Sequence, residues 1–287
     1  MHLSGLHLLL TYQCTFECDH CFVWGSPFQS GTTTLADIRR ILVQAQDTVT
    51  SIYFEGGEAF LYYMTLVQGV RLAAQMGFEV GVVSNAYWAL SLEDARQWLK
   101  PLAGHLHLLT VSNDAYHGNQ ALAENAQIAA QQLGIPVNDI SLVSDQFAVG
   151  QIQGGESGVM HRGRAAVALT EDAPRRPWEY FDTCPYENLR DPGRVHVDPF
   201  GNLHICQGIS LGNMFETPLR DICENYDPDA HPITGPLLAG GPAELVKHHN
   251  LSYEASYVDA CHLCYAARTA LRGQFPDILT PDQMYGV

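Results

Sequence analysis

Three cysteines lie close together near the start of the sequence, and their spacing suits metal chemistry. Cys14, Cys18 and Cys21 are separated by three and two residues, directly after the apolar run LHLLLTY, which predicts a buried β-strand. A curled loop brings three such thiolates to one face of a 4Fe-4S cluster, and three ligands leave one iron open to bind another molecule. Zinc is the alternative, but zinc sites usually complete a tetrahedron with a second cysteine pair, whereas the next cysteine is Cys184. The spacing favours an iron-sulfur cluster with an open iron.

The motif CxxxCxxC resembles the signature of the radical S-adenosylmethionine (SAM) superfamily, in which an aromatic ring precedes the third cysteine. His20 holds that place here. The resemblance implies that His20 lies beside the adenine and that the open iron binds the amino and carboxylate groups of SAM. It also implies that the reduced cluster cleaves SAM to methionine and a deoxyadenosyl radical, which abstracts hydrogen from a substrate, and that a flavodoxin- or ferredoxin-type protein supplies the electron.

A glycine pair follows the second predicted strand. Gly56, Gly57 and Glu58 end the run SIYFEGGE and resemble the family's GGEP motif, with Ala59 in place of the proline. Glycine permits close backbone approach, and a carboxylate accepts hydrogen bonds from an ammonium group. The resemblance implies a contact with the SAM amino group, and a simple glycine turn at the end of a strand is the alternative.

Short polar side chains follow the next two predicted strands. Ser84 and Asn85 come after EVGVV, and Ser112, Asn113 and Asp114 come after HLLTV. Barrel enzymes hold ligands at the carboxyl ends of parallel strands, although these residue types also form turns and helix caps. In the family that this sequence resembles, SAM ribose and carboxylate contacts fall at these two places.

Two arginines stand in the run MHRGRAAV. It resembles a GRA element that precedes auxiliary-cluster domains, which implies that Arg164 pairs with the SAM carboxylate or orients substrate. A surface arginine is the alternative for Arg164, while Arg162 and Arg164 together are the best candidates for a local basic pocket. The preceding run QIQGGESG resembles the family's GxIxGxxE element with one residue fewer, and we assign it no role.

A second group of cysteines occupies the last hundred or so residues. Apolar residues alternate on both sides of the turn DPFGN and predict a β-hairpin that ends at Cys206. One cysteine before this hairpin, one at its end and a later CxxC resemble the twitch region, a shortened SPASM domain that holds a second 4Fe-4S cluster. Four ligands leave no open iron, so such a cluster transfers electrons, and a structural zinc site is the alternative. The four cysteines are Cys184, Cys206, Cys261 and Cys264.

The eighth cysteine, Cys223, stands apart from both groups. A free cysteine donates a hydrogen atom in some radical SAM epimerases. Cys223 follows Ile222 on a predicted amphipathic helix, and buried free cysteine commonly packs as a small apolar side chain, so packing is favoured.

Composition indicates a soluble enzyme and disfavours nucleic acid and membranes as partners. The 287 residues carry a formal net charge of -16, which opposes nucleic-acid phosphates and anionic membranes. No apolar run approaches the ~20 residues of a membrane span. The start, MHLSGLHLLL, contains no basic leader, and we expect a cytoplasmic location, where thiols stay reduced.

Strand-like and amphipathic helix-like runs alternate from Leu6 to about Ala168. Alternating βα units with right-handed crossovers form a parallel sheet, here expected to be a partial (β/α)6 TIM-like barrel. We expect the barrel over residues 1–170, a proline-rich linker over 171–193, and over 194–287 a small twitch/SPASM-like domain that contains a β-hairpin and a helix.

The leading functional hypothesis is a radical SAM oxidoreductase of dehydrogenase type, whose auxiliary cluster accepts the electron that the oxidised substrate loses. In size and motif order the chain is similar to aminocyclitol dehydrogenases of antibiotic pathways. The alternatives are crosslinking or epimerisation of a ribosomal peptide, and a non-catalytic iron-sulfur or zinc scaffold. The substrate is accordingly a small molecule or a peptide, and no catalytic residue is assigned.

Overall fold

Nine strands form one sheet, in the order β10-β9-β8-β1-β2-β3-β4-β5-β6. The computed structural model describes residues 1–118, 120–143 and 156–287, so most of the run QIQGGESG lies outside the described residues. Six strands are parallel in chain order: β1 (Leu3–Leu9), β2 (Ser51–Glu55), β3 (Glu79–Ser84), β4 (Leu108–Ser112), β5 (Val137–Val143) and β6 (Glu156–Gly158). The predicted partial (β/α)6 architecture is confirmed.

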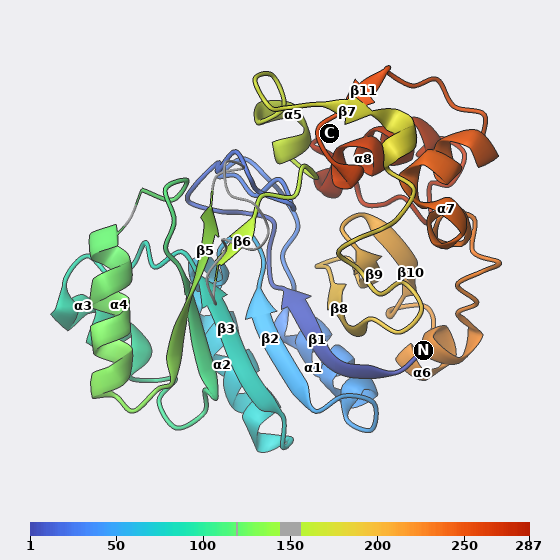
Figure 1. Ribbon diagram of the computed structural model, residues 1–287. Coiled ribbons are helices and arrows are strands. Elements are labelled where there is room, and N and C mark those ends of the chain that lie inside the picture. The colour runs from blue at the N-terminus through green and yellow to red at the C-terminus, as the bar shows by residue number, and fades with distance from the viewer. Residues whose placement is uncertain (119, 144–155) are drawn as a thin grey trace.

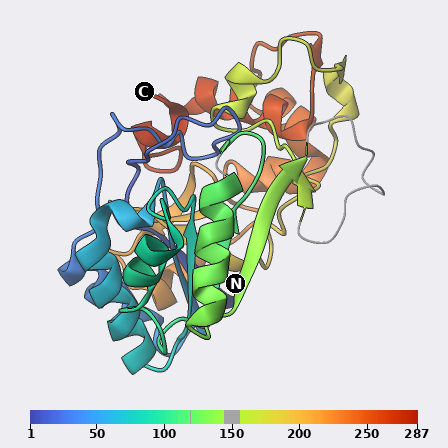
Figure 2. The ribbon, with the colours of Figure 1, turned by 90° about the vertical axis from the view of Figure 1, so that its left-hand side faces the viewer.

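Helices follow the first four strands and cover the outer face of the sheet (Figures 1 and 2). They are α1 (Leu35–Ala45), α2 (Tyr63–Gln75), α3 (Leu92–Leu99) and α4 (Gln120–Gln132). Helix α1 illustrates why they form: Thr34 and Asp37 make a reciprocal capping box at its amino end. Its buried side chains recur with helical spacing and pack on the sheet, and these are Ile38, Ile41, Leu42 and Ala45.

The predicted hairpin forms, but as part of the main sheet. β8 (Gly193–Val197) and β9 (Asn202–Cys206) are antiparallel, and β10 (Ile209–Asn213) follows them. β8 also pairs in parallel with β1, with His7 opposite His196. The sheet therefore crosses the boundary expected between residues 1–170 and 194–287.

A second apolar cluster supports the carboxyl-terminal region, at the upper right of Figure 1. It combines α7 (Thr234–His248) and α8 (Ala260–Leu271) with the short helix α5 (Ala165–Ala168). The small sheet of β7 (Arg176–Pro177) and β11 (Ser256–Tyr257) lies beside it, and α6 (Leu219–Asn225) packs instead against α1. Trp178, Phe181 and Leu189 are buried in this cluster, so the segment expected as a linker packs as part of the domain.

One backbone contact in this region positions a cysteine. Helix α7 is interrupted at Gly241, which has a φ of 64°. A Cβ there would lie 2.3 Å from the backbone nitrogen of Thr183, the residue before Cys184. Glycine is required because the segment carrying Cys184 passes directly over the helix kink.

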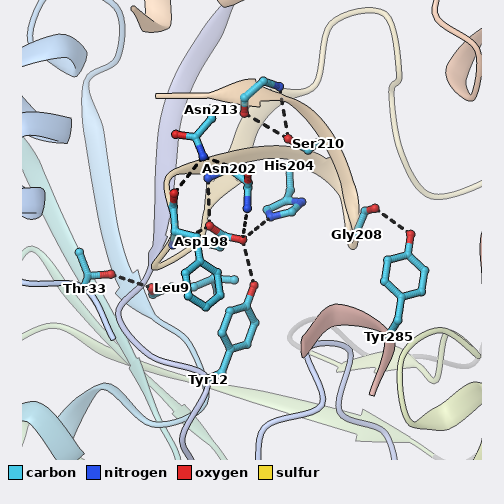
Figure 3. A network of polar contacts seen from close by, with 12 residues as sticks. Leu9, Tyr12, Thr33, Asp198, Asn202, His204, Gly208, Ser210, Asn213 and Tyr285 are labelled. Carbon is cyan, nitrogen blue, oxygen red and sulfur yellow. Dashed lines mark hydrogen bonds and ion pairs between the residues drawn. The ribbon is translucent and has the colours of Figure 1, made fainter. Parts of the chain in front are cut away.

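A buried carboxylate joins the hairpin to the loop after β1 (Figure 3). Asp198 is fully buried in the hairpin turn, and its oxygens accept hydrogen bonds from the Tyr12 hydroxyl at 3.2 Å and the Asn202 side chain at 2.9 Å. His204 Nε2 lies 3.0 Å away, and the backbone amide of Phe200 donates at 2.9 Å. Since Tyr12 stands two residues before Cys14, this network holds the hairpin against the base of the cysteine loop.

Replacing Asp198 by alanine should therefore cost stability. The change leaves several buried donors without an acceptor, so we expect the free energy of unfolding to fall by about 3 kcal/mol. Anaerobic urea unfolding measures this loss. Asp229→Ala is the control, because Asp229 is exposed and its carboxylate pairs with the exposed Arg190. Equal losses in the two variants would contradict the prediction.

No helix in the described ranges is both long and apolar enough to cross a membrane. The fifteen residues of α7 are divided by non-helical backbone at Gly240 and Gly241. The cytoplasmic location stays a prediction.

Candidate cofactor sites and the cavity between them

The first three cysteines converge where β1 ends. They are free thiols on the loop that follows the strand, and they line a cavity of about 130 Å³. The ends of β2, β3 and β4 meet this loop at the same edge of the sheet. Nine of the residues singled out from the sequence line the cavity: Cys14, Cys18, His20, Cys21, Gly56, Gly57, Ser84, Asn85 and Ser112.

The thiols are spaced too widely for a zinc tetrahedron. In the part of the chain that the structure describes, no three cysteine sulfurs lie within 4.8 Å of one another. Zinc with Zn–S bonds of about 2.3 Å holds its sulfurs about 3.8 Å apart. The donor set therefore fits a group larger than a single ion.

Burial suppresses ionisation of these thiols. It raises the pKa of Cys14 to about 12 and that of Cys18 to about 12. Amide groups nevertheless point at the sulfurs: the Gly25 backbone donates to Cys21 Sγ at 3.2 Å, and the Phe16 backbone donates to Cys14 Sγ at 3.4 Å. A bound metal centre stabilises buried thiolates, so these residues fit a cluster better than they fit free thiols.

The glycine pair lets the end of β2 touch the cysteine loop. The Gly57 amide donates to Thr11 O at 2.7 Å, and the Glu58 amide donates to Gln13 O at 2.8 Å. A Cβ on Gly57 would lie 2.1 Å from Gln13 O, a distance that forces the backbone apart. The pair is therefore needed for close approach, as the motif predicted.

Gly57→Ala should disrupt this contact. We expect the variant to retain much less iron after anaerobic reconstitution than the wild type, because the loop with Cys14 must move to accommodate the methyl group. Gly273→Ala is the matched control, since a Cβ there meets nothing within 4 Å. Equal iron contents in the two variants would contradict the prediction.

Glu58 connects strand ends rather than facing the cavity. Its buried carboxylate accepts hydrogen bonds from the Ser84 hydroxyl at 2.9 Å and from the backbone amides of Asn85 and Phe60 at 2.8 and 3.0 Å. Burial raises the pKa of Glu58 to about 7, although the three donors favour the ionised form. A direct contact with the SAM amino group stays a prediction, and the observed role of the side chain is to lock β2 to β3.

Ser84 and Asn85 line the cavity with polar groups that are already bonded. Ser84 Oγ accepts from Trp88 Nε1 at 3.0 Å, and Asn85 Nδ2 donates to Cys14 Sγ at 3.5 Å and to Thr15 Oγ1 at 3.1 Å. Asn85 thus supports the first cysteine directly.

His20 and Asp114 lie at the mouth of the site. The His20 ring packs against the rings of Tyr116 and His117, with centroids 4.7 and 5.2 Å away. Burial lowers the pKa of His20 to about 4, so the ring is neutral and offers a flat face near pH 7. Asp114 Oδ1 lies 2.8 Å from His117 Nδ1. Although burial opposes it, this contact lowers the pKa of Asp114.

Arg164 contacts the cysteine loop. Its guanidinium donates to Cys18 O and to Gly25 O, both at 2.8 Å, and stacks 5.3 Å from the Trp24 ring centroid. The side chain therefore links two backbone carbonyls of the cysteine loop, those of Cys18 and Gly25. These two hydrogen bonds use part of the donor capacity of the guanidinium, and the contact of Arg164 with the SAM carboxylate or the substrate stays a prediction.

The second cysteine group also converges. Two buried arginines accompany it: Arg268 Nε donates to Cys264 O at 3.3 Å, and Arg162 donates to Cys206 Sγ at 3.3 Å. Burial raises the pKa of Cys184 to about 12 and also raises that of Cys261. Buried guanidinium groups are costly without nearby negative charge, and Arg162 already has Glu187 Oε1 at 2.9 Å. Thiolates at the four cysteines would add further negative charge beside both arginines. The four cysteines line one small cavity, and they are Cys184, Cys206, Cys261 and Cys264.

A larger cavity of about 590 Å³ lies on the inner face of the sheet and shares lining residues with the cavities of both cysteine groups. His20 and Phe22 line both this larger cavity and the cavity of the first cysteines. Arg162 lines both the larger cavity and the cavity of the second cysteines. Ser112 and Asp114 also face this space, which has the size of a small-molecule site.

Sequence reasoning missed three residues that face this cavity, His7, Glu55 and His196. Each is a polar residue within or at the end of an apolar strand: LHL, YFE and VHV. Alternation on a strand places such residues opposite the buried face, and that signal was available.

Cys223 lies away from these cavities. It is buried in the main apolar core, on α6, and its backbone oxygen accepts from the amino terminus of Met1 at 2.9 Å. Burial raises its thiol pKa. These observations agree with packing.

Comparisons with known proteins give one relative in sequence. The chain is 27% identical over 120 residues to the putative peptide biosynthesis protein YydG of Bacillus subtilis (strain 168), a match that covers 41% of this chain and 38% of that protein. The chain thus matches well under half of its relative's length. A search with models of known families matches none.

Two solved structures are similar at low sequence identity. BtrN in complex with AdoMet and 2-DOIA is 14% identical, with a TM-score of 0.49 over 78% of this chain and 83% of that chain. Streptococcus suis SuiB bound to the precursor peptide SuiA is 13% identical, with a TM-score of 0.43 over 91% of this chain and 76% of that chain.

Proposed function

We propose that this chain is a radical SAM enzyme that oxidises a substrate held between two 4Fe-4S clusters. The chain resembles this superfamily in the CxxxCxxC loop after β1, the glycine pair after β2 and the parallel sheet. The observation that carries the proposal is the arrangement of the cavities: the 590 Å³ space shares residues with the cavities of both cysteine groups. A substrate there would lie within reach of both.

The cysteine loop and strand ends supply the proposed SAM site. Cys14, Cys18 and Cys21 would hold a cluster whose open iron, when reduced, supplies the electron that cleaves SAM. The neutral His20 ring offers a stacking face for the adenine. Backbone groups at Gly56 and Gly57 are close enough to the loop to contact the amino group, while Arg164 and Glu58 position the surroundings.

The second cysteine group supports an oxidation. Four thiols would fill all ligand positions of a cluster, so its role would be electron transfer. Arg162 stands between this group and the large cavity, and its guanidinium lies 5.6 Å from the centroid of the Phe22 ring, beside Cys21. An electron leaving a substrate in the cavity would have a short route to the second group.

A peptide is the second candidate for the substrate, because the relative YydG is described as a putative peptide biosynthesis protein. Epimerisation of a peptide leaves its mass unchanged in ordinary water and introduces solvent deuterium in heavy water. Oxidation removes two hydrogen atoms. Mass spectrometry of the product therefore distinguishes the two reactions once a substrate is available.

SAM cleavage tests the core of the proposal without a substrate. We expect the anaerobically reconstituted protein, reduced with dithionite, to form deoxyadenosine from SAM, as measured by liquid chromatography. A reductant of flavodoxin or ferredoxin type would replace dithionite in the cell. Absence of deoxyadenosine from a sample with a full iron content would instead favour a non-catalytic scaffold.

A further inference from the structure

Three side chains from three neighbouring strands meet on the inner face of the sheet. His7 is on β1, Glu55 ends β2 and His196 is on β8, and the register places His7 directly opposite His196. The flanking residues Leu6 and Leu8 point to the other face and are buried in the main core. The pleat therefore directs the three polar side chains into the 590 Å³ cavity.

The potential ligand atoms of this trio converge on one point. His7 Nδ1 lies 3.2 Å from Glu55 Oε1, and His196 Nε2 lies 3.0 Å from the same oxygen. All three atoms are within 4.8 Å of one another. Despite these distances, the buried atoms His7 Nδ1 and Glu55 Oε1 have no partner at hydrogen-bonding geometry. The trio is therefore held together by short charge contacts, and its hydrogen-bonding capacity is incompletely used.

The surroundings hold the rings in place while leaving one side open. The His7 ring stacks on Tyr53, with centroids 4.8 Å apart and planes 13° apart, and the His196 ring packs 5.8 Å from Phe22. The side chains of His7, Glu55 and His196 are 12%, 14% and 23% exposed, respectively. That remaining exposure is toward the cavity that they line.

We propose that His7, Glu55 and His196 bind a divalent first-row metal ion on the inner face of the sheet. Two imidazole nitrogens and one carboxylate oxygen form a ligand set used for such ions, and they leave coordination positions open to the cavity. The ion would give His7 Nδ1 and Glu55 Oε1 a common ligand-bonding partner, in place of a mutual contact that has poor hydrogen-bond geometry. It acts as a Lewis acid with a constant oxidation state, and its ligands differ from the sulfur ligands of both cysteine groups.

The metal site narrows the substrate class, and this step rests on the proposed function. An ion with open positions in the cavity binds an oxygen or nitrogen donor of the substrate, such as a carboxylate, an amide carbonyl or an amine. The substrate would then be anchored on the β1, β2 and β8 side of the cavity. Metal binding itself is independent of that function and is measured separately.

A second trio, His20, Asp114 and His117, also has ligand atoms within 4.8 Å of one another. Its carboxylate is already used, because Asp114 Oδ1 accepts from the backbone amides of Tyr116 and His117 at 3.0 and 3.2 Å and lies 2.8 Å from His117 Nδ1. The trio of His7, Glu55 and His196 is therefore the better metal site, and the experiment separates the two.

Mn²⁺ titration of the cluster-loaded protein tests the site. Mn²⁺ prefers nitrogen and oxygen ligands, so it avoids the cysteines, and oxidised 4Fe-4S clusters do not obscure its EPR signal. We expect the wild type to bind about one Mn²⁺ per chain, and Glu55→Gln and His196→Gln each to weaken binding by about tenfold or more. Pulsed EPR of the bound ion should detect coupling to histidine nitrogen.

The controls are His117→Gln in the second trio and His107→Gln at an exposed position, and both should bind Mn²⁺ like the wild type. Iron content and circular dichroism verify that each variant is folded and loaded. The proposal is overturned if the wild type binds no Mn²⁺, if His117→Gln alone abolishes binding, or if Glu55→Gln and His196→Gln both bind normally. If the wild type did not cleave SAM, the proposed function would be refuted, but the Mn²⁺ binding result would still stand.

Discussion

Replacing Cys14, Cys18 and Cys21 together by alanine should remove one complete cluster and abolish SAM cleavage. The three thiols line one cavity beside Gly56 and Gly57, and their sulfurs are spaced too widely for zinc. We expect iron to fall from about eight to about four per chain, since a cluster of this type contains four irons. Iron and sulfide analysis after anaerobic reconstitution, together with the deoxyadenosine assay, measures both effects.

The control for this variant is Cys223→Ala. Cys223 is also a free cysteine, but it is buried in the apolar core away from the described cavities. Its removal should leave the iron content and SAM cleavage unchanged. Deoxyadenosine formation by the triple alanine variant at the wild-type rate would refute the assignment of the first cysteine group.

Replacing Cys261 and Cys264 by alanine should remove the second cluster while sparing the first. Both residues are on α8, and the buried guanidinium groups of Arg162 and Arg268 lie beside their cavity. Loss of two of the four thiols reduces the negative charge beside these guanidinium groups, although Arg162 keeps Glu187 at 2.9 Å, so the variant should also be less stable, by about 2 kcal/mol. We expect iron to fall from about eight to about four, with deoxyadenosine formation from SAM retained and substrate turnover lost.

Zinc analysis of the wild type decides between the two readings of the second group. Stoichiometric zinc with about four irons would make this group a structural site and remove the basis for an oxidation. About eight irons without zinc would support the oxidative reaction. Arg268→Gln provides a companion variant, because it removes one compensating charge while keeping all four thiols.

Several features of the candidate sites were predictable because short-range rules determine them. The hairpin over β8 and β9 follows from alternating residues on both sides of DPFGN, and the structure places it as predicted. Helix α1 follows from its capping box and its apolar spacing. The close approach at Gly57 follows from a residue without a side chain.

The hydrogen-bond partners of Arg164 and Glu58 depend on which distant segments of the chain lie side by side, and no local sequence pattern specifies that arrangement. The motif around Arg164 predicted a contact with SAM or substrate, and it gave no sign that the guanidinium would also donate to the carbonyls of Cys18 and Gly25. The motif around Glu58 predicted a SAM contact, and it gave no sign that the carboxylate would also accept hydrogen bonds from donors at the end of β3 and just after it. Side chains with several donors or acceptors bond to whatever the tertiary structure places beside them.

The sequence by itself determined the spacing of the cysteines, on which the cluster prediction rests, and the alternation of strands and helices, because spacing and periodicity are properties of consecutive residues. Only the tertiary structure decided that β8 lies parallel to β1, across the expected domain boundary. That pairing places His196 beside His7 and Glu55, on the wall of a cavity that shares lining residues with the cavities of both cysteine groups. The physical reason is that parallel pairing joins segments far apart in the chain, and its register is set by burial of the whole sheet rather than by any one stretch of residues.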